Sequence, residues 1–203
     1  MEIVLGSFFS YFMGSIPFGL LLTKIFSNKD IRKIGSGNIG ATNVLRSGNK
    51  SLAIFTLLLD LLKGFLPVLT TQLYFSEYLQ ISCLLAFLGH VFPIWLKFKG
   101  GKGVATFLGI LFALSIQLAL LFIFTWLVLA LIFRYSSLSS MFATFTVFIV
   151  AFIKDGVLDA IDPNLNSDGG FNLILFILFI LIIFTHKKNI SNLKNKTEQK
   201  IKI

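Results

Sequence analysis

Six long apolar segments constrain this chain more than any other feature. Short polar stretches separate them, and they cover residues 3–26, 51–75, 78–96, 104–133, 138–153 and 171–185. A bilayer core about 30 Å thick takes roughly 20 apolar residues per helical crossing, and a helix satisfies its own backbone hydrogen bonds there. With 56% hydrophobic residues, 13% charged residues and a mean hydropathy of +0.87, the 203-residue chain is predicted to be an all-α integral membrane protein.

The distribution of charge predicts which loops face the cytoplasm. The formal net charge is +9, and the basic residues gather in loops 27–50 and 97–103 and in the tail 186–203. Glu77 and the aspartates of 155–168 lie in the intervening loops. By the positive-inside rule the basic segments are cytoplasmic, the N-terminus is outside and the C-terminus is inside. The charge therefore reflects membrane topology, and no nucleic-acid partner is expected.

The apolar segment 104–133 has to cross the membrane twice for this charge pattern to hold, because a single crossing would place the basic tail outside. At 1.5 Å per residue it supplies only about 45 Å, less than two full crossings. We therefore expect two short helices, or a turn inside the protein, near residues 115–117. The sequence predicts about seven transmembrane helices in one polytopic domain, residues 1–203.

Two glycine-rich polar stretches, residues 35–50 (GSGNIGATNVLRSGNK) and 97–106 (KFKGGKGVAT), carry phosphate-site chemistry. Glycine lets backbone N–H groups approach an anion closely, and nearby basic side chains add positive charge. Gly35, Gly37 and Gly40 have GxGxxG spacing, but no βαβ unit surrounds them, which excludes a dinucleotide fold. The second stretch lacks the upstream glycine and the Ser/Thr of a P-loop. We expect the two stretches to meet at one membrane face.

The histidines and the ionisable residues within apolar segments are few. His90 and His186 have no metal-ligand spacing around them, so no metal site is predicted. His90 is expected to make a structural hydrogen bond near a span end. Asp60 and Lys63 stand three residues apart within an apolar segment, where ionisable groups are costly. They form either a mutually neutralised structural pair or part of a functional site.

Five stretches together resemble one family. They are GSIPFG at 14–19, DIRKIGSGNIGATNVLR at 30–46, GHVFPIWLKFKGGKGVATFLG at 89–109, RYSSLSS at 134–140 and HKKNI at 186–190. In this order they are similar to the acyl-phosphate-dependent glycerol-3-phosphate acyltransferases of bacterial membranes, the PlsY family. The resemblance implies a multi-pass enzyme of the bacterial plasma (inner) membrane whose active site faces the cytoplasm. It would transfer a fatty acyl group from acyl phosphate to the sn-1 hydroxyl of glycerol 3-phosphate, giving lysophosphatidate and phosphate for phospholipid synthesis.

The resemblance also implies site residues and partners. Catalytic roles fall on Ser36, Arg46, Lys102, His186 and Asn189. Substrate and phosphate binding falls on Gly35, Gly37, Asn38, Gly40, Thr42, Asn43, Gly100, Gly101, Gly103 and Ser140. No cofactor is expected. The expected partners are glycerol 3-phosphate, a long-chain acyl phosphate, membrane lipid and the upstream enzyme that forms the acyl phosphate. The proton acceptor is either His186 or a substrate phosphate.

The tail departs from the family pattern RHRENIxRLxxGxE, because Thr185 and Asn192 replace arginines and Lys196 replaces the glycine. His186, Asn189 and Glu198 remain. The main alternative function is a transporter or channel for an organic phosphate, since basic loops at a membrane face would serve it too. The chain shows no inverted repeat, and its charges lie at a face rather than at the midplane, which favours the enzyme.

Overall fold

The computed structural model describes residues 2–161 and 171–201, and no β-strand occurs among them. The all-α prediction is therefore confirmed for this part of the chain. The chain divides into two compact units, Met1–Ser115 (unit 1) and Ile116–Ile203 (unit 2). The single polytopic domain stays a prediction.

The longer helices coincide with the predicted apolar segments, and short helices and 3₁₀ turns (η) also occur in the polar stretches. Unit 1 contains α1 (Glu2–Ser15), α2 (Phe18–Ser27), η1 (Ile31–Lys33), α3 (Ala41–Arg46), α4 (Lys50–Tyr74), η2 (Ser76–Tyr78), α5 (Leu79–Val91), η3 (Ile94–Leu96) and α6 (Val104–Leu114). Unit 2 contains α7 (Ile116–Phe133), α8 (Ser136–Ile161), α9 (Asn172–Thr185) and α10 (Lys187–Lys194).

The first apolar segment forms two helices where the sequence predicted one continuous span. Helices α1 and α2 meet at a bend of 41°. Ile16 and Pro17 lie at the bend, and proline explains it because it has no N–H to donate and disfavours helical geometry in the residue before it. The Ile16 carbonyl freed by the break accepts hydrogen bonds from Phe18 N at 3.1 Å and from Lys63 Nζ at 2.6 Å.

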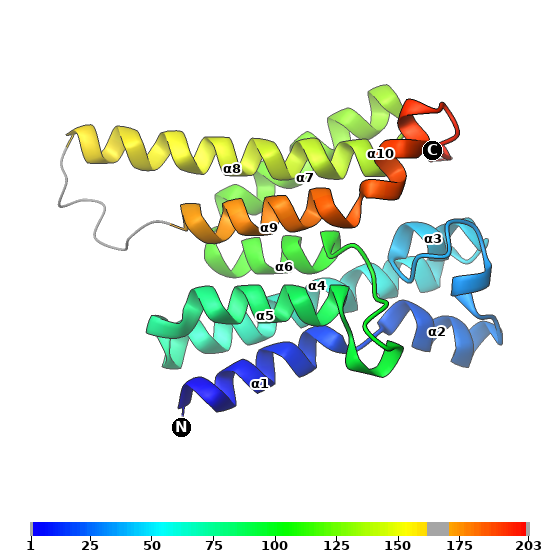
Figure 1. Cartoon of the computed structure of the whole chain (residues 1–203), viewed down its shortest axis with the longest axis horizontal. Coiled ribbons are helices and arrows are strands. Elements are labelled where there is room, and N and C mark those ends of the chain that lie inside the picture. The colour runs from blue at the N-terminus through cyan, green and yellow to red at the C-terminus, as the bar shows by residue number, and fades with distance from the viewer. Residues whose placement is uncertain (1, 162–170, 202–203) are drawn as a thin grey trace. The chain divides into compact units, whose positions relative to one another are not determined.

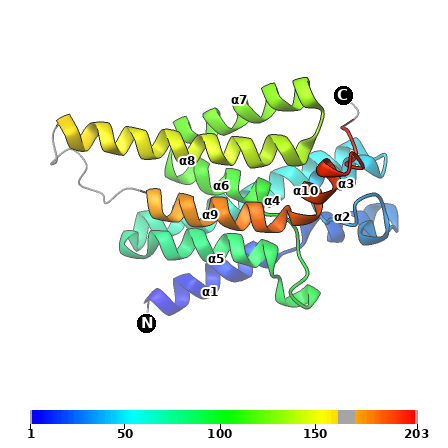
Figure 2. The same ribbon diagram turned by 45° about the horizontal axis from the view of Figure 1, so that its top comes forward.

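Within unit 1, helices α1, α4, α5 and α6 run side by side, as Figures 1 and 2 show. Glycines permit close contact between them. A Cβ on Gly14 of α1 would collide with the backbone of Ala86 in α5, and a Cβ on Gly64 of α4 would collide with the backbone of Thr106 in α6. Small residues at helix contacts are typical of membrane bundles, where close van der Waals packing replaces the hydrophobic effect.

Aromatic side chains contribute contacts between the helices of unit 2. The rings of Phe148 and Phe179 stack with their centroids 6.2 Å apart, which joins α8 to α9. Trp126 Nε1 of α7 donates to Ser140 Oγ of α8 at 3.0 Å. After α10 the chain returns to the start of α8, where Ile201 N donates to the Arg134 carbonyl at 2.7 Å.

The predicted break in segment 104–133 is confirmed, because α6 ends at Leu114 and α7 begins at Ile116. Among the described residues, four helices are long and apolar enough to cross a membrane, or up to six if the bent pairs α1–α2 and α9–α10 each form one span. Helix α6 is a shorter apolar helix. Large apolar side chains point outward, and Leu73, Phe124 and Ile132 are 67%, 68% and 66% exposed. The count of seven crossings and the orientation of the termini stay predictions.

Cysteine labelling in intact cells tests this topology. In a Cys83→Ala background, Lys99→Cys and Lys188→Cys should be protected from an impermeant thiol reagent, whereas Glu77→Cys should react, because the basic loops are predicted to be cytoplasmic. All three positions are exposed, so protection reports the membrane side rather than burial. Labelling at Lys99→Cys together with protection at Glu77→Cys would show that the orientation in the membrane is the opposite of the predicted one. The aspartates at 162 and 168, also predicted to be external, lie outside the described residues.

Candidate functional site

The first glycine-rich loop is built around the buried amide of Asn43. Its Nδ2 donates to the carbonyls of Ile31 (3.1 Å), Ile34 (2.9 Å) and Asn38 (2.7 Å), and its Oδ1 accepts from Ser36 N (2.9 Å). These contacts use both N–H donors of the amide, so in this structure Asn43 shapes the loop rather than offering a donor to a ligand.

Gly35 and Gly37 turn the loop at positive φ values of 55° and 74°, a region that side chains with a Cβ disfavour. A Cβ on Gly35 would also collide with Asn43 Oδ1 and would lie 3.7 Å from Arg46 Cδ. The side chain of Arg46 therefore lies beside this turn. Gly35 is required by the backbone angle and by the close packing of the loop on itself.

The other predicted residues of this loop lie around the same turn. Ser36 is exposed, and Thr42 is half-buried in the first turn of α3. Asn38 Oδ1 accepts from Ile39 N at 2.9 Å. The carbonyl of Gly40 accepts from Asn43 N at 3.0 Å and so begins α3. Ser36 is therefore the exposed hydroxyl at the tip of the loop.

Asp30 is the carboxylate next to this loop, and Arg32 engages it fully. Arg32 Nη2 lies 2.6 Å from Asp30 Oδ2, and Arg32 Nε donates to Asp30 Oδ1 at 2.9 Å. These hydrogen bonds hold the pKa of the Asp30 carboxyl well below its usual range. A carboxylate so stabilised is a poor proton acceptor at neutral pH.

The second glycine-rich loop folds back onto the end of α5. Gly100 N donates to the Val91 carbonyl at 3.0 Å, and Gly101 N donates to the His90 carbonyl at 3.1 Å. A Cβ on Gly101 would collide with the His90 imidazole, and a Cβ on Gly103 would collide with the ring of Phe87. These glycines are thus needed for packing, a role that the sequence did not reveal. Lys102 lies between them and is half-buried.

The structure brings both loops to the same end of unit 1 (Figures 1 and 2). Ile31 and Ile39 of the first loop belong to a buried cluster with Leu20 of α2 and Val44 of α3. Leu96, just before the second loop, packs against the same cluster. One hydrophobic core therefore supports both loops.

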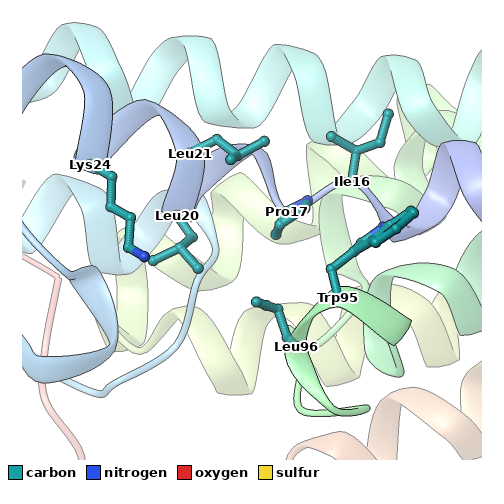
Figure 3. A pocket seen from close by; sticks show the side chains of 7 residues that line it. All are labelled: Ile16, Pro17, Leu20, Leu21, Lys24, Trp95 and Leu96. Atoms are coloured by element: carbon teal, nitrogen blue, oxygen red, sulfur yellow. The ribbon is translucent and has the colours of Figure 1, made fainter.

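A groove of about 390 Å³ opens beside this cluster (Figure 3). Its lining is apolar apart from Lys24, which lies at one end, while Trp95 lies toward the other. Trp95 Nε1 donates to Ser15 Oγ at 2.8 Å, which anchors the indole. The lining residues are Ile16, Pro17, Leu20, Leu21, Lys24, Trp95 and Leu96. The groove could not be predicted from the sequence, because its residues come from separate elements: the α1–α2 break, α2 and η3.

In unit 2, His186 is buried at the 56° bend between α9 and α10. Its Nδ1 lies 2.8 Å from the Ile182 carbonyl. A carbonyl oxygen only accepts hydrogen bonds, so Nδ1 carries the hydrogen and Nε2 is the acceptor nitrogen of the neutral ring. Asn189 follows on the next turn and is also buried.

Glu198 is a residue whose contribution the sequence analysis missed. Its Oε1 accepts from Asn189 Nδ2 at 2.6 Å and from Ser137 Oγ at 2.8 Å, and its Oε2 accepts from Asn192 Nδ2 at 3.3 Å. Glu198 thus fixes Asn189 and ties the tail to α8. The sequence contained the signal, since Glu198 is part of the tail pattern, but its partners are set by how the tail folds back.

Ser140 is a predicted phosphate-binding residue that the structure places in helix packing. Its Oγ donates to the Ser136 carbonyl at 2.8 Å and accepts from Trp126. Its one hydroxyl hydrogen is therefore used inside unit 2.

Lys196 shows how the altered tail is accommodated. It has a φ of 58°, the left-handed region that the family's glycine would adopt without strain. We expect Lys196→Gly to raise unfolding stability by about 0.5–1 kcal/mol, the relief of strain less the entropy cost of glycine. Thermal unfolding in detergent measures it. Lys194→Gly, at the last residue of α10, is the matched control and should lower stability, because a helical φ gives no strain relief to offset the entropy cost of glycine. Equal effects of the two changes would show that Lys196 is not strained.

The sequence and structure are similar to those of known acyltransferases. The family model for glycerol-3-phosphate acyltransferase matches residues 4–196. A glycerol-3-phosphate acyltransferase of Pelagibacter ubique (strain HTCC1062) is 53% identical over 205 residues and covers 100% of both chains. One from Wolbachia pipientis subsp. Culex pipiens (strain wPip) is 50% identical over 194 residues, 94% of each chain.

Two crystal structures of PlsY (YgiH), an integral membrane glycerol 3-phosphate acyltransferase, have the same fold. The glycerol 3-phosphate form superposes with a TM-score of 0.88 at 36% identity, covering 100% of this chain and 96% of that one. The lysophosphatidic acid form gives a TM-score of 0.85 at 35% identity, covering 98% and 95%. These matches extend over nearly the whole length of each protein. The chain therefore belongs to the glycerol-3-phosphate acyltransferase family.

Proposed function

We propose that this glycerol-3-phosphate acyltransferase takes its fatty acyl group from an acyl phosphate and attaches it to the sn-1 hydroxyl of glycerol 3-phosphate. The products are lysophosphatidate and inorganic phosphate. One observation carries the proposal: two basic, glycine-rich loops share one end of unit 1 with an apolar groove that has a lysine at its end. The basic, glycine-rich loops suit phosphate groups, and the apolar groove suits a fatty chain.

Arg46 and Lys102 are the proposed phosphate-binding side chains. The guanidinium of Arg46 offers parallel donors that match two phosphate oxygens, whereas the ammonium of Lys102 acts as a point charge. Lys102 is carried by a loop whose backbone is pinned to the end of α5. The groove beside the loops is the proposed route of the acyl chain, with Lys24 toward the anionic head.

The reaction requires few catalytic groups because an acyl phosphate is already activated towards acyl transfer. The glycerol hydroxyl oxygen attacks the carbonyl carbon, the bond from that carbon to the phosphate oxygen breaks, and phosphate leaves. Positioning and charge stabilisation are then the main demands on the protein. The hydroxyl proton passes to a substrate phosphate, whose second pKa near about 6 suits it to accept a proton.

His186→Gln tests the alternative proton acceptor, because Nε2 of the neutral ring is an acceptor nitrogen. We expect the variant to retain a measurable rate with an unchanged pH profile, since a phosphate group takes the proton. A complete loss of turnover with normal substrate binding would assign the proton to His186. That His186 and Asn189 act as positioning donors for the substrates stays a prediction.

The nature of the acyl donor distinguishes this reaction from others with the same product. A coenzyme A thioester brings several phosphates and an adenine, which need more basic surface than the two loops offer. An acyl carrier protein needs a docking area of several hundred Å² on its partner. A single phosphate on an acyl chain matches a phosphate-sized site beside an apolar groove.

The decisive assay offers each donor separately to protein purified in detergent, with labelled glycerol 3-phosphate as acceptor. We expect lysophosphatidate acylated at sn-1 from palmitoyl phosphate, and little or none from palmitoyl-CoA or palmitoyl carrier protein. Comparable rates from the thioesters would overturn the donor. If no donor gives product while proteoliposomes take up glycerol 3-phosphate, the protein is a transporter.

The proposed location follows from the positive-inside rule. The basic loops and tail are placed at the cytoplasmic face of the bacterial plasma membrane, where glycerol 3-phosphate is supplied in solution. The acyl phosphate is delivered within the membrane, so an enzyme that forms acyl phosphates must act upstream.

A further inference from the structure

The proposed function leaves the buried pair Asp60 and Lys63 without a role. Their side chains lie in α4 and are at most 3% exposed, and Lys63 Nζ lies 2.7 Å from Asp60 Oδ1. Removing both partners of such a pair in favour of apolar residues of similar volume is often neutral or stabilising. Stability alone therefore does not explain why an apolar helix carries it.

The contacts of the pair extend to two other elements of unit 1. Lys63 Nζ donates to the Ile16 carbonyl at the α1–α2 break and lies 5.7 Å from the centre of the Phe18 ring. Asp60 Oδ1 lies 3.8 Å from Nδ1 of His90, near the end of α5. The pair thus connects the bend of the first apolar segment to the end of the third.

His90 in turn supports the second glycine-rich loop by two separate contacts. Its carbonyl accepts the hydrogen bond from Gly101 N at 3.1 Å. Its imidazole lies so close to Gly101 that a Cβ there would collide with Nε2, Cε1 and Cδ2, the three nearest atoms. The orientation of this ring therefore fixes how closely the chain before Lys102 approaches α5. Among the described residues, His90 Nδ1 has no hydrogen-bond partner, so its nearness to Asp60 is the polar contact on that side of the ring.

We propose that Asp60, Lys63 and His90 are positioning residues for the second loop, and that they set the place of Lys102 through Gly101. The chain of contacts runs from the Ile16 carbonyl through the ion pair and the imidazole to the loop. All of it lies within unit 1. The inference rests on the proposed role of Lys102 in phosphate binding.

The first test replaces both members of the pair. Asp60→Leu/Lys63→Met removes both charges at similar volume, so no lone buried charge remains. We expect its thermal midpoint in detergent to stay close to that of the parent protein. The KM for a phosphate-bearing substrate should rise by about tenfold or more, comparable to losing one charged hydrogen bond. The kcat should change less. Thr71→Val is the control, because Thr71 is a buried polar residue of the same helix whose hydroxyl bonds only within α4, and its kinetics should stay unchanged.

Hydrogen exchange provides a readout that does not depend on activity. The peptide containing Gly100 and Gly101 should exchange faster in the double variant, because the amides bonded to Val91 and His90 open more often. The first loop should exchange as in the parent protein. Parent-like KM values and parent-like exchange in a folded double variant would overturn the inference. So would a double variant that fails to insert, since the pair would then act on folding.

A double-mutant cycle tests the contact between His90 and Gly101 while leaving the ion pair in place. Gly101→Ala should raise KM because its methyl group displaces the ring, and His90→Ala should raise KM because the ring is lost. In the double variant Gly101→Ala/His90→Ala, KM should rise no more than in the worse of the two single variants, because the added methyl group no longer meets the ring. If the fold-increases in KM of the two single variants multiply in the double variant, the contact does not position the loop. A parent protein with no acyltransferase activity would refute the proposed function, whereas the exchange data would still decide the positioning.

Discussion

Asn43→Asp should lower acyltransferase activity by about a hundredfold or more. The change keeps the size of the side chain and the oxygen that accepts from Ser36 N. It replaces the NH₂ group, which donates to the carbonyls of Ile31, Ile34 and Asn38, with an oxygen that cannot donate. The carbonyls of Ile31 and Ile34 keep backbone hydrogen bonds from Ile34 N and Gly37 N, but the Asn38 carbonyl loses its donor. A buried carboxylate would also face three carbonyl oxygens, so the loop loses roughly 3 kcal/mol or more. That amounts to about two orders of magnitude if the active loop geometry is lost to the same extent.

Steady-state kinetics on purified variants measures this effect, and Asn49→Ala is the matched control. Asn49 lies a few residues further along the same loop, and its Oδ1 makes a single capping bond from Leu52 N at 3.0 Å. Loss of a helix cap costs about 1 kcal/mol of stability, and we expect little change in KM. If Asn43→Asp retains parent activity, the amide does not organise the loop.

Arg46→Lys and Lys102→Ala should each reduce kcat/KM by about ten- to a hundredfold, the equivalent of one hydrogen bond to a charged group. Arg46→Lys keeps the positive charge but loses the planar fork that matches two phosphate oxygens, so a conservative change is expected to be costly. Lys102→Ala removes the charge from a loop whose backbone stays pinned by Gly100 and Gly101. We expect it to cost at least as much.

The same assays separate binding from folding. Arg32→Ala is the control, because Arg32 lies in the same basic loop but pairs with Asp30 on the surface. Its removal should leave the kinetics close to those of the parent. Parent-like kinetics in both Arg46→Lys and Lys102→Ala, with both proteins folded, would remove these side chains from the phosphate site.

The apolar segments were predictable because burial in lipid acts on composition and length, which are local properties. The break at Ser115 was predictable because the distribution of charge requires segment 104–133 to cross the membrane twice, and because that segment is too short for two full crossings. Pro17 is a signal for a helix bend, but the bend was not predicted, because the apolar segment 3–26 continues without interruption through this residue. The two loops were recognised as phosphate-binding candidates because glycine and basic residues cluster in each of them.

The contacts of individual site residues depended on the tertiary structure. Asn43 was expected to contact a phosphate, yet its donors face backbone carbonyls of its own loop, because the loop closes around it. Ser140 was expected in the site, yet its hydroxyl is used by Ser136 and Trp126. Whether a polar side chain has a donor left for a ligand depends on neighbours distant in sequence.

The sequence by itself determined that the chain is helical, apolar and built to lie in a membrane, and which two loops carry the basic, glycine-rich chemistry. Composition, the length of the apolar segments and charge are enough for that, since they are properties of consecutive residues. Only the tertiary structure decided that His90 lies against Gly101, that Lys63 reaches the carbonyl at the α1–α2 bend, and that Glu198 holds Asn189. These contacts join residues separated by up to 47 positions, and such pairs are set by how helices pack rather than by any local pattern.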